Sequence, residues 1–587
     1  MKIAKKILEW KRRGYALLLT VVFIAIALSL LAGLMAWTSG GTSQVDRNNL
    51  FRASTGAAEA ASSLTIAYMW RDFYNQSFSS TNSYTDYLPD QSAWPVQFAF
   101  SDGSGTQNQS GVTSGPANWT TNWQSLNAFG APYSGLSAFV AQCAVTSKAM
   151  TKNQAYDVSA TVQQKFDLAA IPIFQFAVFY NLNMEIDPGA AMTISGPVFS
   201  NDGIWARGLA TYGSSVSAVG TVSTGSGDPY VTGKTDNTAS TFNGSVTTNM
   251  DSLTLPLGTT NGAAGTRALL GLPPSGTPPY SEAGQEYFAN EANIIISNSA
   301  DGNMTAFFQD PTVNPPLALI PNNHTNLTPN GTFGGYTTYT TNYDYTFATN
   351  VQFYDYREGK TVQAVQLDVN KLNLWLSNSS GGLGLNNKMN VDSGHHINSV
   401  YVYNNAQSSS SSLPAVRVAN GAVLPSDGLT VVTPDPLYVM GNYNANAANN
   451  STGPAALIGD AITVLSGNWS DSYNFGTKTS ARLASNTTIN AATLEGIVQS
   501  TGGNYSGGVE NFLRLLEDWG DNKNVLTYNG SIVVMFPSQY ATNHWSGSYY
   551  SIPKRNWSFD VSFMTQKGLP PITPQVRAII RQNWAVY

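Results

Sequence analysis

The sequence is poor in charge, in histidine and above all in cysteine. Only 11% of its 587 residues are charged, and it contains four histidines and one cysteine; a soluble globular domain usually carries about 25% charged residues. A single cysteine, Cys143, excludes an intramolecular disulfide and any zinc site built from clustered cysteines. Hydrophobic residues make up 42% and aromatic residues 11%, which excludes an intrinsically disordered chain. The length allows several domains or one large domain.

The few charged residues are distributed unevenly. Six lysines and arginines lie in the first thirteen residues, against one acid, Glu9. The rest of the chain holds 23 basic and 34 acidic residues, a net charge of −11. Binding to phosphate backbones depends on clustered lysine and arginine, so this acidic, charge-poor body predicts no nucleic-acid partner.

An uncharged apolar run follows the basic cluster, over residues 15–37. As a helix it would span about 35 Å, and a bilayer core needs about 20 helical residues. The basic residues before it predict a cytoplasmic N-terminus with the rest of the chain outside. A cleaved secretory signal is the alternative interpretation. It fits less well because the apolar part of such a signal is usually about 7–15 residues long, and no A-x-A-like cleavage box follows Met35.

The junction between the basic cluster and the apolar run carries a more specific pattern. Lys11, Arg12 and Arg13 are followed by Gly14 and the aromatic Tyr15. This junction resembles the class III signal of type IV pilins and pseudopilins. The resemblance implies that a prepilin peptidase cleaves between Gly14 and Tyr15, that the new N-terminus is methylated, and that the apolar helix stays in place.

One position departs from the major pilins of that family. They have a glutamate five residues into the mature chain, where this sequence has Leu19, and residues 15–30 contain no acid. This departure resembles PilX-type minor pilins and tip pseudopilins. It implies a minor subunit rather than the bulk protein of a filament.

The helical pattern continues beyond the apolar run. Residues 47–61 resemble the end of PilX-type N-terminal domains, and residues 179–189, 428–444, 508–519, 553–560 and 569–574 resemble parts of large PilX-like ectodomains. A narrow stripe of mostly small residues alternates spacings of four and three: Leu50, Ser54, Ala57, Ala61, Leu64 and Tyr68. The stripe can pack on another helix or on the chain's own ectodomain. Gly40 and Gly41, before the stripe, favour a hinge just outside the membrane.

Beyond about residue 75 the sequence predicts a mainly β body. Short apolar segments are punctuated by glycine, asparagine, aspartate and proline, which favour turns. The expected strands lie at 171–180, 192–204, 217–222, 230–232, 245–248, 416–418, 430–432, 438–440 and 461–465. Such strands indicate an irregular β-solenoid or a sandwich. Apolar spacing also predicts short capping helices at residues 509–519 and 574–584.

The expected fold is therefore an N-terminal transmembrane helix, extended by an amphipathic helix, before a mainly β ectodomain with short capping helices. The expected divisions are a basic prepilin leader (1–14), the transmembrane helix (15–37), an extended pilin-like helix with a glycine hinge (38–75), a loop-rich mixed segment (76–170), the β-rich domain (171–500) and a C-terminal capping region (501–587).

Residues that could carry chemistry are few. His395 and His396 follow Asp392, but neighbouring residues of a strand point to opposite faces, so a polar loop is the better interpretation. Asp301, Asp310 and Asp435 lack the ladder spacing of a calcium loop. The carboxylates at positions 185, 187, 510, 517 and 518 are interpreted as loop and helix-surface residues. We expect no enzyme activity, metal or cofactor, and a buried thiol at Cys143.

The sequence thus predicts a single-pass protein of a bacterial inner membrane that acts as a minor pilin-like subunit in a type IV pilus or pseudopilus. Its expected partners are the lipid bilayer, other pilin or pseudopilin subunits and the prepilin peptidase. Its body would be periplasmic or extracellular. The alternatives are a membrane-anchored adhesin or carbohydrate-binding protein outside any filament and, less favoured, an anchored polysaccharide hydrolase.

Overall fold

The computed structural model describes most of the chain in two compact units. The described residues are 2–74, 97–101, 111–114, 122–129, 135–152, 156–224, 239–253, 262–279, 281, 283–300, 302–310, 313–319, 328–333, 336–340, 346–377, 397–446, 452–547 and 549–587. Unit 1 comprises Met1–Asn122, Phe139–Ala170 and Arg577–Tyr587, and unit 2 comprises Trp123–Ala138 and Ile171–Val576.

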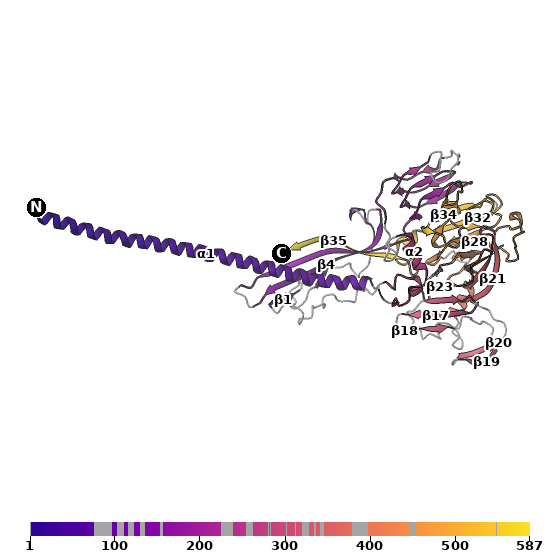
Figure 1. Cartoon of the computed structure of the whole chain (residues 1–587), viewed down its shortest axis with the longest axis horizontal. Coiled ribbons are helices and arrows are strands. Elements are labelled where there is room, and N and C mark those ends of the chain that lie inside the picture. The colour runs from indigo at the N-terminus through magenta and orange to yellow at the C-terminus, as the bar shows by residue number, and fades with distance from the viewer. Residues whose placement is uncertain are drawn as a thin grey trace. The chain divides into compact units, whose positions relative to one another are not determined.

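Unit 1 begins with one helix, α1 (Lys2–Tyr74), which has 73 residues (Figure 1). The sequence of α1 contains no proline, and its apolar first half and alanine-rich second half both favour a helix. The helix continues through Gly40 and Gly41, so these glycines do not end it. The long apolar helix expected at the N-terminus is therefore confirmed, and the expected hinge lies inside an unbroken helix.

Replacing Gly40 and Gly41 by alanine is expected to stiffen this part of α1. Each glycine lowers helix stability by about 1 kcal/mol relative to alanine, and the side chains around both are exposed, so no packing compensates for this loss. Amide hydrogen exchange of residues 38–48 in detergent should slow by about tenfold or more. Gly56→Ala, at an exposed position of the same helix, is the control and should leave this exchange unchanged. Equal exchange in the double variant and the unmodified chain would contradict the expectation.

The rest of unit 1 is a sheet in the order β1-β4-β5-β35. Its strands are β1 (Phe98–Ser101), β4 (Ser137–Thr151), β5 (Ser159–Pro172) and β35 (Gln575–Val586), and β2 (Gly111–Ser114) and β3 (Asn122–Ser125) also pair with β4. β4 is antiparallel to β1 and β5, with Cys143 opposite Phe166. Thr161 and Tyr587 exchange two backbone hydrogen bonds of 3.0 and 2.8 Å, which joins the C-terminus to β5. Strands β4 and β5 lie in the segment expected to be rich in loops.

The helix expected at residues 574–584 is wrong, because this segment forms β35. Val576, Ile579 and Ile580 fit a helical spacing after Pro574, but the same residues fit a strand rich in β-branched side chains. Pairing with β5 decides between the two structures, and such long-range pairing is not visible in local spacing.

Unit 2 begins with short strands that stack in three parallel ladders. The strands are β6 (Val178–Tyr180), β7 (Met184–Ile186), β8 (Met192–Ser195), β9 (Val198–Ser200), β10 (Ile204–Ala206), β11 (Ala210–Tyr212), β12 (Val216–Ala218), β13 (Val222–Ser223), β14 (Thr241–Phe242) and β15 (Val246–Thr247). Each strand pairs in parallel with the third strand after it: β6 with β9, β7 with β10, and so on to β12 with β15. Each turn of the chain therefore adds one strand to each ladder.

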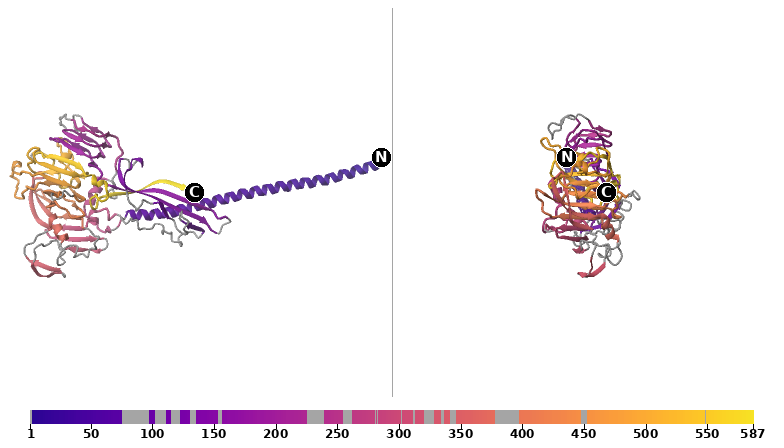
Figure 2. Two further views of the ribbon diagram at one scale, coloured as in Figure 1. Left: turned by 180° about the vertical axis from the view of Figure 1, so that it is seen from behind. Right: turned by 90° about the vertical axis from the view of Figure 1, so that its right-hand side faces the viewer.

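The second half of unit 2 extends two of these ladders from the other side. Figure 2 shows the magenta strands of the first half and the orange and yellow strands of the second half. Its strands are β16 (Ile294–Asn298), β17 (Met304–Asp310), β18 (Val313–Leu319), β19 (Thr328–Phe333), β20 (Tyr336–Thr340), β21 (Phe347–Asp355), β22 (Lys360–Asp368), β23 (Ser399–Asn404), β24 (Ser412–Ala419), β25 (Leu429–Val432), β26 (Leu437–Met440), β27 (Ala455–Gly459), β28 (Ile462–Leu465), β29 (Thr487–Asn490), β30 (Ala492–Ile497), β31 (Arg514–Leu515), β32 (Val525–Gly530), β33 (Ile532–Pro537) and β34 (Lys554–Phe559). β33 pairs with β6, and β34 pairs with β8, both in parallel.

The mainly β body is thus confirmed, with few helices: α2 (Ala263–Leu270), α3 (Phe288–Glu291) and α4 (Val369–Ser377). Most of the expected strands coincide with described ones, whereas residues 230–232 lie outside the described residues. The segment 171–180 is divided, because β5 ends at Pro172 and β6 begins at Val178. Asparagine and glycine occupy turns with left-handed backbone, as at Asn420, Asn444 and Gly428. A Cβ at Gly428 would clash with the carbonyl oxygen of Pro454.

The amphipathic helix expected at residues 509–519 is also wrong. The segment forms a 3₁₀ turn, Val509–Asn511, and the short strand β31. Nearly all of it is buried, including Glu510 and Glu517. An amphipathic helix needs a polar face in water, and a segment enclosed on all sides has no such face.

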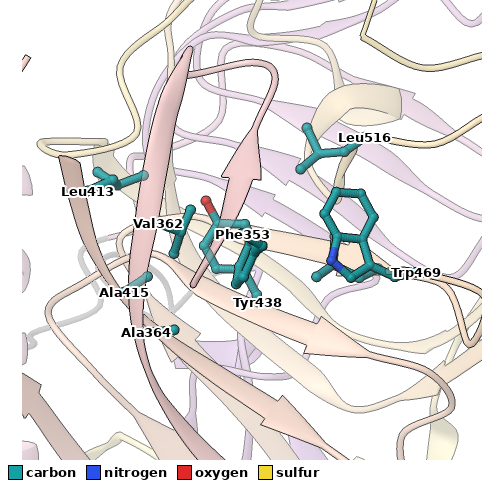
Figure 3. Close-up of a cluster of buried hydrophobic side chains, with 9 residues drawn as sticks. Phe353, Val362, Ala364, Leu413, Ala415, Tyr438, Trp469 and Leu516 are labelled. Atoms are coloured by element: carbon teal, nitrogen blue, oxygen red, sulfur yellow. The ribbon is translucent and has the colours of Figure 1, made fainter. Parts of the chain in front are cut away.

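The core of unit 2 lies between the stacked strands. One cluster joins the hairpin β21–β22 to β24, β26 and the segment after β28 (Figure 3). The ring of Phe353 lies edge-on to Tyr438 and Trp469, at 4.9 and 5.9 Å between centroids. Such edge-to-face pairs stabilise by about 0.5–1.5 kcal/mol beyond the burial of their area, so this cluster fixes the hairpin on the ladder.

Candidate membrane-anchoring helix

Residues 15–37 of α1 expose all of their large apolar side chains. Tyr15 is 73% exposed, Leu17 71% and Trp37 77%, and the large apolar side chains between them are also exposed. Among the described residues, α1 is the one helix that is long and apolar enough to cross a membrane. An apolar surface of this length in water is strongly unfavourable. The helix is therefore compatible with a single-pass membrane anchor.

The second half of α1 packs on the sheet of unit 1. The residues buried along this face are Ser54, Ala58, Ala61, Thr65, Met69 and Asp72. They recur at spacings of three and four, which places them on one side of a helix. Their small size in the first turns lets the helix approach the sheet closely.

Contacts with β4 and β5 fix this half of α1. Ala58 lies in one buried cluster with Ala149 and Val162. The hydroxyl of Ser54 donates to the carbonyl oxygen of Val158 at 3.0 Å, and the amide of Gln164 donates to the hydroxyl of Ser62 at 2.6 Å. The sequence-predicted stripe overlaps this face only in part.

Ser54 and Ala61 of the stripe are fully buried in unit 1, whereas Leu50, Ala57, Leu64 and Tyr68 are only half-buried. The buried face is shifted by about one residue toward Ala58 and Thr65. Of the two interpretations of the stripe, packing on the chain's own sheet is the one that the structure shows for Ser54 and Ala61.

The sheet beneath α1 holds a buried thiol and a buried carboxyl. Cys143 is 5% exposed, as expected, and burial followed by the charge of Asp167 raises its pKa to about 12. Burial also raises the pKa of Asp167, whereas a hydrogen bond from Gln582 on β35 lowers it. The thiol is therefore protonated at neutral pH and unreactive.

The residues of the predicted processing signal are part of α1. Lys11, Arg12, Arg13 and Gly14 are within the helix, and Tyr15 is exposed at the start of the apolar half. No acid occurs between Tyr15 and Asp46. The processing itself stays a prediction from the sequence.

Of the five carboxylates interpreted as loop and helix-surface residues, Glu185, Glu510 and Glu517 are instead buried in unit 2, whereas Asp187 and Asp518 are half-buried. Glu185 and Glu510 are 2% and 5% exposed. Ser500 donates to Glu185 at 2.5 Å, and Tyr505 donates to Glu510 at 2.8 Å. Burial raises the pKa of both Glu510 and Tyr505. Sequence spacing gave no signal for this cluster, because more than 300 residues separate the two acids.

The backbone of Asp187 contacts the carboxylate of Glu510. The amide of Asp187 donates to Glu510 at 3.2 Å. Glu517 accepts two hydrogen bonds from Ser466, at 2.6 and 2.7 Å, and Asp518 accepts one from Ser551. These acids therefore hold the turns of the body together.

Only some of the candidate metal ligands lie among the residues that the structure describes. His395, His396, Asp392 and Asp301 lie outside the described residues. Asp435 is buried and accepts a hydrogen bond of 3.1 Å from the amide of Asn404. Within the described residues, histidine, cysteine, aspartate and glutamate form no group of three that could hold a metal ion.

Comparisons with known proteins give distant likenesses, and these lie among solved structures. No protein-family model matches the chain, and no curated protein matches it. Among solved structures, the chain is similar to the crystal structure of the competence-associated pilin ComZ from Thermus thermophilus. The two share 12% identical residues over 91% of this chain and 96% of the other, with a TM-score of 0.28. The likeness is too distant to assign a function to this chain.

Proposed function

We propose that the protein is a membrane-anchored, minor pilin-like subunit of a type IV pilus or pseudopilus, and that α1 is its anchor. The observation that carries this proposal is the division of α1 into a bare apolar half and a half packed on an antiparallel sheet. A helix that only anchored a separate ectodomain would not need its second half built into the sheet.

Processing completes the proposal. A prepilin peptidase would cut after Gly14, and Tyr15 would become a methylated N-terminus. The basic residues Lys11, Arg12 and Arg13 support a cytoplasmic leader. Leu19, in place of the acid of major pilins, supports a PilX-type minor subunit that starts or caps a filament. The compartment would be the inner membrane, with the body in the periplasm or outside the cell.

The body would act by presenting surfaces rather than by catalysis. The stacked parallel strands support an irregular β-solenoid, in which each turn of chain adds one strand to each ladder. The engagement of the buried acids with turn residues supports structural roles for them.

Gly14→Ala is expected to block maturation in a host that has a prepilin peptidase. The peptidase acts at the peptide bond after this glycine, and a Cβ would crowd that bond. We expect a shift of the full chain on gels by the mass of the leader, with no mature form. Gly33→Ala is the control, because this glycine lies in the same helix with open space around it, and the control should be processed normally. Normal processing of Gly14→Ala would contradict the proposal.

A second candidate function, an anchored adhesin outside any filament, is favoured by one loop of unit 2. Phe475 is 80% exposed, on a loop that is held firmly. Arg482 donates to the carbonyl oxygen of Thr477 and lies 3.4 Å from the ring centroid of Tyr356, whose hydroxyl donates to Asn474 at 2.7 Å. A rigid loop with a bare aromatic tip suits surface contact. Processing at Gly14 separates the two candidates.

A further inference from the structure

The outer edge of the sheet in unit 1 is formed by β35. β35 ends the strand order β1-β4-β5-β35, so among the described strands none pairs with its outer edge. Tyr587 exchanges both backbone hydrogen bonds with Thr161 on β5. Because successive residues of a strand alternate in direction, the backbone groups of Val586 and Trp584 point outward.

This edge has few of the features that protect sheet edges. Natural edges are shortened, bulged or interrupted by proline, but β35 has 12 residues and contains no proline after its start. Trp584 is 49% exposed and Tyr587 71% exposed. The exposed stretch of β35 is Arg581, Gln582, Asn583 and Trp584. A long edge without proline favours the addition of another strand.

A hollow of about 240 Å³ is lined by residues of α1, β5 and β35. Glu59 and Ile66 of α1, Phe166 of β5, and Arg581 and Trp584 of β35 are among the residues that line it. The wall is therefore apolar and aromatic in part, with charged groups beside it. Strand addition commonly uses such a pocket to select one side chain of the added segment.

Charge determines what kind of segment fits. Lys165 and Arg581 are both exposed at the hollow, against one acid, Glu59. A second copy of β35 could pair antiparallel with this edge. Two of the central registers would place arginines directly opposite each other, Arg577 opposite Arg581 in one and Arg581 opposite Arg581 in the other. Like charges directly opposite each other are unfavourable. A segment that carries a carboxylate would instead gain a charge-assisted hydrogen bond.

We propose that the outer edge of β35 binds an extended, acidic segment of a partner polypeptide as an added strand, with one apolar side chain in the hollow beside Trp584. The edge belongs to unit 1 alone, so the inference does not depend on entry into a filament. The partner is a polypeptide with alternating apolar and acidic residues.

The test uses the full chain in detergent and a labelled, end-capped peptide of eight residues in which valine and threonine alternate and two positions are glutamate. We expect a Kd of about 10–100 μM. A peptide with lysine in place of glutamate should bind about tenfold more weakly. A peptide methylated on alternate backbone amides should not bind, because it cannot pair with the edge.

Two variants place this binding on the edge. Arg581→Glu and Trp584→Ala should each weaken the glutamate peptide by about tenfold. Both positions are exposed, so the thermal unfolding midpoint should stay unchanged. Lys478→Glu, an exposed charge reversal in unit 2, is the matched control and should leave the Kd unchanged.

Three results would overturn the proposal: no binding of the glutamate peptide, equal binding of all three peptides, or unchanged binding in both edge variants. A different outcome is self-association of the full chain, with loss of this self-association in the Trp584→Ala variant. That result would assign the edge to a second copy and would also overturn the proposal. None of these results depends on processing at Gly14, so failure here is distinguishable from failure of the proposed function.

Discussion

Ala58→Asp is expected to destabilise the packing of α1 on its sheet by about 3–5 kcal/mol. Ala58 has no exposed surface and lies against Ala149 and Val162. A carboxylate there would be buried without a partner, which is among the largest single-residue effects known in proteins. The second half of α1 should then become sensitive to limited proteolysis at 25 °C.

Ala60→Asp provides the matched control for this variant. Ala60 is exposed on the opposite face of the same turns of α1, so its aspartate stays hydrated. Proteolysis of the unmodified chain, Ala58→Asp and Ala60→Asp should show early cleavage within residues 54–74 only for Ala58→Asp. Equal resistance of the two variants would contradict the packing of α1 on the sheet.

Unit 2 is expected to be more stable at pH 5 than at pH 8. Burial raises the pKa of Asp435 from 3.8 to about 7 and that of Glu517 from 4.5 to about 7, and it also raises the pKa of Glu495 and Glu510. In the unfolded chain these acids lose their protons near their ordinary pKa values. Between about pH 4 and pH 7 the folded state therefore binds more protons, and stability falls as the pH rises.

The size of this effect is large for a single group. A pKa shift of one unit corresponds to about 1.4 kcal/mol, so Glu517 alone should lower the free energy of unfolding by about 3 kcal/mol between pH 4.5 and pH 7. Above about pH 8 these acids are ionised in both states, so the profile should level. Thermal unfolding midpoints of the full chain, recorded in steps from pH 4.5 to pH 8.5, measure this slope.

Glu517→Gln removes one titrating group from the profile. The slope between pH 5 and pH 7 should then decrease by about 1.4 kcal/mol per pH unit, the contribution of one proton. Asp521→Asn, which removes an exposed carboxylate, is the matched control and should leave the slope unchanged. A stability that rises from pH 5 to pH 8 in the unmodified chain would contradict the account of these buried acids.

The parts of the fold that the sequence predicts are those with strong local signals. The apolar run before Trp37 and the alanine-rich stretch around Ala58 each fit a helix, and α1 contains both. Short apolar segments between turn residues mark buried strands, as at Thr430 and Ile462, because strands covered on both faces need no alternation.

The errors lie where distant pairing overrides local spacing. Ile579 and Ile580 fit a helix locally, but β35 belongs to a sheet whose other strands are more than 400 residues earlier in the chain. Residues 509–519 fit an amphipathic helix, but burial of Glu510 and Glu517 leaves no polar face.

The candidate anchor was predictable, but its exact packing face was not. Spacing selects a face of α1 to within about one residue, and the sheet decides which neighbours are buried. Ser54 and Ala61 were identified, whereas Ala58 and its contact with Val162 required the structure. The buried pair of Glu185 and Glu510 has no signal in the sequence, since the two residues are neighbours only through the stacking of the ladders.

The central claim is that the chain is processed and anchored as a pilin-like subunit. It is tested most directly by the mass of the N-terminal peptide of the membrane-extracted protein, produced in a host that has a prepilin peptidase. We expect a mature chain that begins at methylated Tyr15 and retains residues 15–37. A chain that begins at Met1, or one cleaved after residue 37, would contradict it.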